Sequence, residues 1–445
     1  MSLFSTLGTG ASGMSASSST LGVIGDNIAN IGTTGFKSSR AFYVDMMPGK
    51  MGSASGPATL GRGAMLGGIS SSFEQGALTQ TGGVLDMAVV GNGLFPVSQG
   101  GETMYTRDGS FQLDREGYVT NLSGARLQGY QAEDGVLSSN FGELQLDTGP
   151  YPQQATSTVS MSATLTADPD ITTSPIAAGV FDGTAAAMGL TELSDAADYD
   201  TSLTVYDSLG MPHEVNVVFE ATSSTDWTWK AVVDGGQIDL DGDGAPDGEP
   251  GQAFEISGGT MNFSGTGEMV GFTQTDTTSA WNWGGAEPFT FTFDGGLDAA
   301  GNPTDAGSIR VSGDQSSLTS LSQDGFPQGN LVDLAVQPDG RIEAIYDNGQ
   351  NRAVGGVALA TFAATNQLER AGGNMYRATF QSGEALVGTA EQGANGSLVS
   401  RVLEASNTDL ESEFIAMIQA QRSFSANAGT VRTADETLQE LVNLI

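Results

Sequence analysis

The chain ends with the stretch TDLESEFIAMIQAQRSFSANAGTVRTADETLQELVNLI, residues 408–445, whose apolar spacing predicts one long helix. One line of apolar residues repeats every seven positions: Leu410, Met417, Phe424, Val431, Leu438 and Ile445. A second line lies between them: Phe414, Gln421, Ala428, Asp435 and Val442. Together they follow the a/d spacing of a coiled coil. About 38 residues make a helix roughly 57 Å long, and a stripe this narrow needs a partner helix from this chain or another copy.

The start of the chain carries a weaker seam of the same kind. Its heptad line is Leu7, Met14, Leu21 and Ile28, with Leu3, Gly10, Ser17, Ile24 and Ile31 between. The glycines of this stretch each lower helix propensity by up to about 1 kcal/mol relative to alanine. Residues 32–37 form a turn cluster that should end the helix. Two interpretations stay open: the termini zip together as the stalk of one fold, or subunits of a polymer assemble through them.

Composition excludes several classes of protein. The 445 residues include 16 Lys and Arg against 52 Asp and Glu, a formal net charge of −36. Such a chain is a poor binder of nucleic acid or anionic membranes, which need a basic surface. With no Cys, it has neither disulfides nor a thiol nucleophile. It has no apolar run long enough to insert in a membrane and no secretory signal pattern at its start. We therefore expect either a cytoplasmic protein or export without a cleaved signal peptide.

The residues between the two helices read as β structure. Short alternating runs separated by Asn-Gly and Asp-Gly turns predict an inner β domain from residues 73–146 and 326–390. Residues 48–72, rich in Gly, Ser, Ala and Met, predict a flexible or loosely extended connector. With this connector, the predicted terminal helical domain comprises residues 1–72 and 391–445.

An acidic insert, residues 147–325, predicts an outer β domain. Residues 146–325 hold 27 Asp and Glu against 2 Lys and Arg, a net charge of −25. All four Trp lie here as two W-x-W pairs, and strand alternation should place each pair on one face. The expected fold class is thus mainly β, as nested β domains, with long N- and C-terminal α-helices forming a coiled-coil inner layer.

Motifs that carry chemistry are scarce. The single histidine, His213, follows Met211-Pro212 at a predicted turn and has no cysteine or second histidine to act with, so we assign no catalytic residue. One stretch matches the first half of a calcium loop, with Asp239, Asp241 and Asp243 as candidate ligands. Its twelfth position is Pro250 instead of Glu, which leaves a metal-free acidic turn as the alternative. Apart from this calcium candidate, we expect no cofactor.

Three groups of residues resemble the flagellar rod and hook family of bacterial axial proteins. At the start they are 26–30 (DNIAN) and 33–37 (TTGFK), with Asp26 where the family usually has Asn. Near the end they are 417–424 (MIQAQRSF), 426–427 (AN) and 433–436 (TADE). In the inner β domain they are 86–88 (DMA), 91–95 (GNGLF) and 105–111 (YTRDGSF). Residues 324–329 (DGFPQG) and 348–350 (NGQ) are most similar to the hook members of the family.

The resemblance implies a structural subunit of the hook, a flexible hollow tube that transmits torque from rod to filament. It implies a homopolymer, placed outside the cell at the flagellar hook and exported through the flagellar type III apparatus without a cleaved signal. The implied partners are the distal rod protein, the hook–filament junction protein, the hook cap and the hook-length ruler. The implied polymerisation interface comprises Leu7, Met14, Leu21, Ile28, Asn27, Asn30, Gly35, Phe36, Leu410, Met417, Phe424, Val431 and Leu438. The alternatives are a distal rod protein and a secreted acidic hydrolase with stalk-forming ends.

Overall fold

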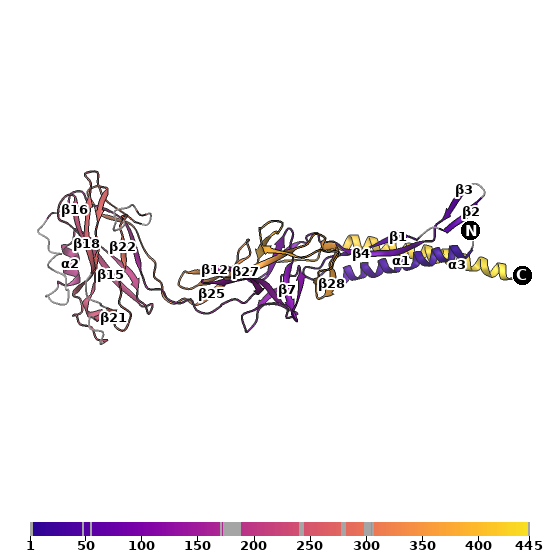
Figure 1. Cartoon of the computed structure of the whole chain (residues 1–445), viewed down its shortest axis with the longest axis horizontal. Helices are drawn as coiled ribbons and strands as arrows, with labels where there is room; N and C mark the ends of the chain where they lie inside the picture. Colours follow the sequence, from indigo (N-terminus) through magenta and orange to yellow (C-terminus); the bar gives the residue numbers. More distant parts are fainter. Residues whose placement is uncertain are drawn as a thin grey trace. The chain divides into compact units, whose positions relative to one another are not determined.

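The computed structural model describes residues 3–46, 49–53, 56–169, 171, 188–239, 244–276, 282–297, 304 and 307–443. It forms two compact units (Figure 1). Unit 1 comprises residues 1–148, 331–345 and 351–445, and unit 2 comprises residues 149–330 and 346–350. The mainly β fold with a long helix at each end confirms the predicted fold class. The predicted terminal domain and most of the predicted inner β domain fall in unit 1, but residues 326–330 and 346–350 of the inner β domain belong to unit 2. Unit 2 begins at residue 149, close to the predicted start of the acidic insert.

The two terminal helices of unit 1 are α1 (Leu3–Ala29) and α3 (Leu410–Asn443). They pack against each other, and both chain ends lie at the same end of the pair (Figure 1). Asp409 caps α3, because its carboxylate accepts a hydrogen bond from the backbone N–H of Glu411 at 3.1 Å. Glu411 and Glu413 follow in the first turn, where the helix dipole favours acidic side chains. No helix in the described part of the chain is long and apolar enough to cross a membrane.

Where residues 48–72 were predicted to be a flexible or loosely extended connector, the structure has paired strands. β2 (Gly49–Ser53) pairs with β3 (Gly56–Leu60), and β4 (Ala64–Ser71) pairs with β1 (Ser39–Asp45), which precedes the region. The β1–β4 hairpin is held against α1 by Tyr43, whose hydroxyl donates to the carbonyl of Ala16 at 2.7 Å. The two-residue alternation typical of a strand was not visible in the sequence, because Gly67 and Gly68 interrupt the apolar run of β4 and because Phe42, Val44 and Met65 are apolar residues that face solvent.

The β part of unit 1 is one large sheet with two short ladders at the base of the helices. The sheet runs in the order β25-β26-β27-β11-β7-β8-β29-β28, with β9, β10, β12 and β30 paired to it. Its strands are β7 (Phe95–Gln99), β8 (Glu102–Thr106), β9 (Phe111–Leu113), β10 (Val119–Asn121), β11 (Arg126–Glu133), β12 (Val136–Glu143), β25 (Leu331–Val336), β26 (Arg341–Tyr346), β27 (Asn351–Thr361), β28 (Glu369–Gly372), β29 (Met375–Arg377) and β30 (Leu386–Thr389). The ladders join β5 (Leu78–Gln80) to β32 (Val402–Glu404) and β6 (Met87–Val90) to β31 (Ser397–Ser400), so both halves of the chain build this unit.

Unit 2 holds two sheets around one apolar core. One sheet contains β13 (Thr158–Leu165), β22 (Thr292–Asp294), β23 (Ser308–Val311) and β24 (Ser317–Gln323). The other contains β14 (Tyr199–Tyr206), β15 (Pro212–Ala221), β16 (Asp226–Asp234), β18 (Ala253–Phe263), β19 (Met269–Phe272) and β20 (Thr275–Asp276). Short elements complete it: α2 (Leu190–Ala196), β17 (Ile238–Asp239) and β21 (Asn282–Trp283). Trp227 and Trp229 are buried on the same face of β16, which confirms the prediction for this pair; Trp281 lies outside the described residues.

Candidate functional site

The helical pair is antiparallel and closely packed. A Cβ atom added to Gly10 would lie 2.6 Å from Cγ2 of Val431, and one added to Gly13 would lie 2.6 Å from Nδ2 of Asn427. At the other end of α1, the side chain of Asn27 donates to the carboxylate of Glu413 at 3.0 Å. These glycines lower helix propensity, but here they let the two backbones approach more closely than any side chain would allow. The first interpretation of the seams, in which the termini zip together, therefore holds within one chain.

The residues of the predicted heptad line face this contact to different extents. Leu7, Met14, Leu21 and Ile28 on α1, and Met417, Val431 and Leu438 on α3, are half-buried, whereas Leu410 and Phe424 are exposed. The line predicted between them on α1 is correct in its middle, where Gly10, Ser17 and Ile24 are buried. On α3 the interleaved line of Phe414, Gln421, Ala428 and Asp435 does not face α1 within the chain, because all but the half-buried Ala428 are exposed. The more buried residues there are Glu413, Ala420, Asn427 and Ala434, one position earlier, and Asn427 lies against Gly13 of α1.

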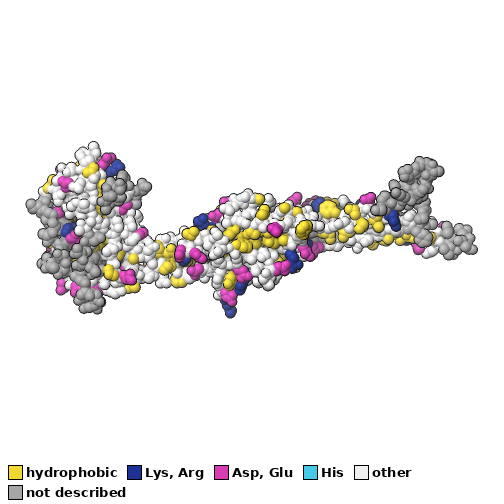
Figure 2. All heavy atoms as spheres, viewed as in Figure 1, with side chains coloured by type: hydrophobic (Ala, Val, Ile, Leu, Met, Phe, Trp, Pro, Cys, Tyr) yellow, Lys and Arg dark blue, Asp and Glu magenta, His cyan; other side chains and the backbone are white. Residues whose placement is uncertain are grey.

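A second apolar stripe on α3 is left uncovered. Its residues are Leu410, Phe414, Ile415, Ile418 and Phe424, each between 39% and 51% exposed. The outer face of the β1–β4 hairpin exposes Phe42, Val44 and Met65 in addition. Figure 2 shows hydrophobic side chains at the surface of unit 1. Contiguous exposed apolar surface on a soluble chain usually marks an interaction site.

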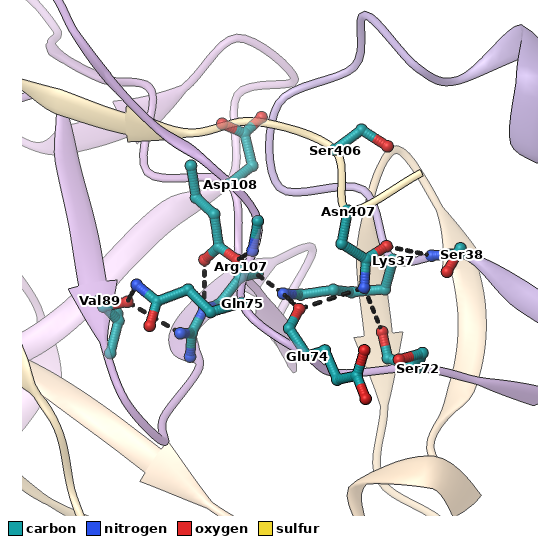
Figure 3. Close-up of polar contacts among 12 residues, drawn as sticks. Lys37, Ser38, Ser72, Glu74, Gln75, Val89, Arg107, Asp108, Ser406 and Asn407 are labelled. Carbon is teal, nitrogen blue, oxygen red and sulfur yellow. Dashed lines mark hydrogen bonds and ion pairs between the residues drawn. The ribbon is translucent and has the colours of Figure 1, made fainter. Parts of the chain in front are cut away.

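Below the helices, a buried polar junction joins the two ends of the chain to the β sheet (Figure 3). The carboxylate of Glu404 accepts hydrogen bonds from Nζ of Lys37 at 2.7 Å, from Nε of Arg107 at 2.7 Å and from the backbone N–H of Gly76 at 2.8 Å. The three charged side chains are at most 5% exposed. Because these residues come from three distant parts of the sequence, the junction can form only when the N-terminal segment, the β sheet and the C-terminal segment meet.

The remaining donors of the junction are satisfied by backbone carbonyls. Lys37 also donates to the carbonyl of Glu74 at 2.6 Å. The guanidinium of Arg107 donates to the carbonyls of Val89 at 2.8 Å and Gly91 at 2.7 Å, and to that of Gly93. Two cations against one carboxylate would be costly in a dry interior, and these carbonyl dipoles offset the excess positive charge.

The buried environment shifts the pKa values of both Lys37 and Glu404. Burial lowers the pKa of Lys37, and the hydrogen bond and negative charge of Glu404 only partly oppose that shift. For Glu404, burial alone would raise the pKa, but the charge of Arg107 and the hydrogen bonds from Lys37 and Arg107 outweigh it and hold the pKa below its ordinary value. The lowered pKa of Glu404 fits an ionised carboxylate at neutral pH.

Two other predicted interface residues, Asn27 and Gly35, lie beside this junction. Asn27 is buried and forms reciprocal hydrogen bonds of 2.9 Å with the backbone of Ser39, which fix the chain as it leaves α1. Gly35 has φ +67°, and a Cβ there would lie 2.6 Å from the backbone nitrogen of Asp108, so this turn requires glycine.

Phe36 and Asn30 take different places. Phe36 is buried under the guanidinium of Arg370, 4.8 Å from the ring centre. Asn30 is half-buried and donates back to the carbonyl of Asp26 at 2.9 Å. Asp26, the departure from the family pattern, pairs with Arg370 at 3.1 Å. Local turn and docking contacts thus explain these residues within one chain.

Sequence reasoning missed the centre of the junction. Lys37 and Arg107 both lie inside stretches quoted for the family resemblance, yet neither was selected, and Glu404 was not noticed at all. A usable signal was present, because the chain has only 16 basic residues and two of them fall in motifs that otherwise hold small, apolar and turn-forming residues. Asn407 was not selected either, although its side chain bridges the backbone of Ser38 and Ser72 at 2.7 and 2.9 Å.

The calcium candidate stays a prediction. Asp239 is buried at the end of β17, and its carboxylate accepts a hydrogen bond from the backbone N–H of Gly244 at 2.8 Å. Asp241 and Asp243 lie outside the described residues. Within the described ranges, no group of three or more His, Asp or Glu residues is placed to hold a metal ion.

Comparison with known proteins gives consistent matches along the whole chain. The matching family models are described as flagella basal body rod protein (residues 7–37), flagellar hook protein FlgE/F/G D1 domain (88–167), flagellar basal body protein FlaE D2 domain (181–326) and flagellar basal body rod FlgEFG protein C-terminal (399–444). The third of these models lies within unit 2. Lys37 of the junction lies in the first model, Arg107 in the second and Glu404 in the last.

Curated relatives match over nearly their full length. The flagellar hook protein FlgE of Escherichia coli K12 is 32% identical over 97% of this chain and 98% of its own. The proteins of the same name from Salmonella typhimurium and Treponema pallidum are 33% and 30% identical, over 97% and 100% of this chain and 98% and 99% of their own. Neither a distal rod protein nor a hydrolase is favoured by these matches. The chain belongs to the flagellar hook protein family.

Proposed function

We propose that copies of this chain polymerise through their terminal helices into the hollow, flexible tube of the hook, which carries torque from the rod to the filament. The uncovered stripe of α3 carries this proposal. One face of α3 is already satisfied by α1, yet five large apolar side chains on another face remain exposed. Because each is already about half-buried, each would gain roughly 0.7–1.5 kcal/mol on full burial, so a neighbouring copy that covers the stripe supplies the driving force for assembly.

The junction would stiffen each subunit where its terminal helices meet its β sheet. A torque applied to the helices must pass into the β sheet through residues 35–38 and 404–407. The buried contacts of Lys37, Arg107 and Glu404 make this passage rigid within a subunit, while contacts between subunits are free to slide as the tube bends. In this account torque passes through packing alone, and no step of catalysis is required.

Assembly at the hook would also need specific partners. We infer export through the flagellar type III apparatus without a cleaved signal, assembly under a hook cap, and length control by a ruler. The completed tube would contact the distal rod protein at one end and the hook–filament junction protein at the other. The family matches to rod and hook models support this placement.

The test is a charge placed in the uncovered stripe. Ile418→Asp should abolish polymer formation by the purified chain and motility when the variant replaces the hook protein of a flagellated cell, because a carboxylate buried between subunits is strongly disfavoured. Gln419→Asp is the matched control, since Gln419 is exposed and lies next to Ile418 but outside the stripe. Sedimentation and electron microscopy measure the tubes, and circular dichroism confirms the fold. Normal tubes from Ile418→Asp would contradict the proposal.

A further inference from the structure

The chain contains three Asn-Gly pairs, at residues 92–93, 348–349 and 395–396. Asparagine is a thermolabile residue. It reacts most readily before glycine, because glycine has no side chain to obstruct the attack of its backbone nitrogen on the carbon of the asparagine amide. The three pairs have the same two residues, so a difference in their reactivity must come mainly from the fold.

The second pair is held at both reacting groups. Nδ2 of Asn348 donates to the carbonyl of Pro327 at 2.9 Å, and Oδ1 accepts from the backbone N–H of Gln350 at 3.1 Å. The attacking nitrogen, that of Gly349, donates to the carbonyl of Tyr346 at 3.2 Å. Asn348 is also half-buried. Reaction at this pair must first break hydrogen bonds to the amide and to the attacking nitrogen.

The third pair is held in the same way. Nδ2 of Asn395 donates to the carbonyl of Thr389 at 2.9 Å. The attacking nitrogen, that of Gly396, donates to the main-chain carbonyl of Asn92 at 2.7 Å. Asn395 is half-buried as well. The fold therefore protects two of the three pairs by the same means.

The first pair lacks this protection. Asn92 is exposed, and within the described part of the chain neither its side-chain amide nor the backbone N–H of Gly93 has a hydrogen-bond partner. Gly91 and Gly93, with φ +95° and +135°, flank Asn92 on both sides. Glycine on each side gives the main chain of Asn92 the conformational freedom that ring closure requires.

We propose that Asn92 is a site of spontaneous deamidation and isomerisation in the folded chain. The backbone nitrogen of Gly93 attacks Cγ of Asn92, the bond between Cγ and Nδ2 breaks, and ammonia leaves with the proton of the attacking nitrogen. Water then opens the cyclic succinimide at either carbonyl, which leaves an aspartate or an isoaspartate at position 92. The reaction needs no partner protein and does not depend on whether copies of the chain polymerise.

The modified residue lies where it affects the buried junction. The guanidinium of Arg107 donates to the carbonyls of Val89 and Gly91 at 2.8 and 2.7 Å, and to that of Gly93, so it binds the main chain on both sides of Asn92. An isoaspartate adds a methylene group to the main chain between the carbonyls of Gly91 and Gly93. Arg107 then cannot keep both acceptors in place, and the junction weakens. An aspartate leaves the length of the main chain unchanged and should disturb these contacts less.

Peptide mass spectrometry of the full chain, incubated in mildly alkaline buffer, measures the reaction, and electron-transfer fragmentation distinguishes isoaspartate from aspartate. Because Asn92 and Gly93 have no such hydrogen bonds to break, Asn92 should react roughly ten- to one-hundred-fold faster than Asn348 and Asn395. The same chain unfolded in urea is the control, and there the three rates should be similar. Equal rates in the folded chain, or the same preference for Asn92 in urea, would overturn the inference.

Hydrogen exchange tests the effect on the junction. Peptides covering β6 and β31, the strands beside the junction, should exchange faster as isoaspartate accumulates at position 92. Asn92→Gln, incubated in the same way, controls for general ageing and should keep its original exchange. Freshly prepared Asn92→Asp carries the charge of the product on an ordinary main chain and should change less than the isoaspartate form. Accumulated isoaspartate with unchanged exchange in both strands would refute the weakening of the junction.

Discussion

Replacing Glu404 by Gln tests whether the buried junction holds the ends of the chain to the β sheet. The substitution keeps the size of the side chain but removes the one carboxylate shared by Lys37 and Arg107, both almost fully buried. Two cations would then remain without a counter-charge, and one of the hydrogen bonds donated by Nζ of Lys37 or Nε of Arg107 would be lost, because the amide NH2 of Gln is itself a donor. Breaking a buried ion pair from one side costs about 3–5 kcal/mol. We expect a loss of that size in the free energy of unfolding of unit 1.

The assay can separate the two units. All four Trp lie between residues 227 and 283, inside unit 2, so Trp fluorescence reports unit 2 alone. Hydrogen exchange on peptides covering β6 and β31 reports the strands next to the junction. Glu404→Gln should speed exchange in these peptides and leave the Trp transition unchanged. Glu102→Gln, which removes the partner of the exposed Arg377, is the matched surface control and should change neither.

The same reasoning fixes a pH dependence. Because the pKa of Glu404 is depressed in the fold, its contribution to stability is complete above the ordinary pKa of glutamate, about 4.3, and is lost as pH falls through the folded value. The difference between the original chain and Glu404→Gln should therefore shrink in acid. Exchange rates that are equal in both proteins at neutral pH, or a Trp transition that shifts as much as the exchange does, would refute the role of the junction.

Three further predictions follow from the same contacts. Gly13→Ala should weaken the helical pair because its methyl group meets Asn427. Gly22→Ala, with open space around the new Cβ, should instead stabilise α1 by up to about 1 kcal/mol. Thermal unfolding of assembled tubes, followed by circular dichroism at 222 nm, compares the two variants. Limited proteolysis of the monomer should trim both helices and stop near residues 34 and 408, where the junction begins; cleavage well inside these limits would mean that the junction is open before assembly. Lowering the salt from 0.15 M to 0.01 M lengthens the Debye length from about 8 to 30 Å and should straighten or dissolve tubes through repulsion between acidic inserts, as seen by electron microscopy; a calcium effect that survives Asp241→Asn would remove that loop from the account.

The helices could be predicted from sequence because their a positions are large apolar residues at fixed spacing. Met417, Val431 and Leu438 do face α1. The second line does not face α1 within the chain, because a heptad template looks for large side chains. Ala420 and Ala434, one position earlier, are buried instead, and Asn427 lies against Gly13 of α1. Which small residues meet depends on the distance between the helices, and that distance is a property of the pair rather than of either stretch alone.

The junction shows a different limit. Glu404 lies 297 residues from Arg107 and 367 residues from Lys37 in the sequence. Nothing local in a single sequence links one acid among 52 to two particular cations. The strands of residues 49–71 were missed for the opposite reason. Their composition is that of a linker, and they become strands because Tyr43 and its neighbours dock the β1–β4 hairpin on α1. In both cases, tertiary contacts determine a structure that local sequence preferences do not specify.

The central claim is that the uncovered stripe of α3 becomes an interface between copies of the chain. It is tested most directly by the reactivity of a single thiol placed in that stripe, in the cysteine-free background of this sequence. Phe414→Cys should react rapidly with a maleimide in the monomer and slowly in assembled tubes, while Gln419→Cys, exposed outside the stripe, should react more rapidly in the tubes than Phe414→Cys does. Equal reactivity of Phe414→Cys in monomer and tube would contradict the account.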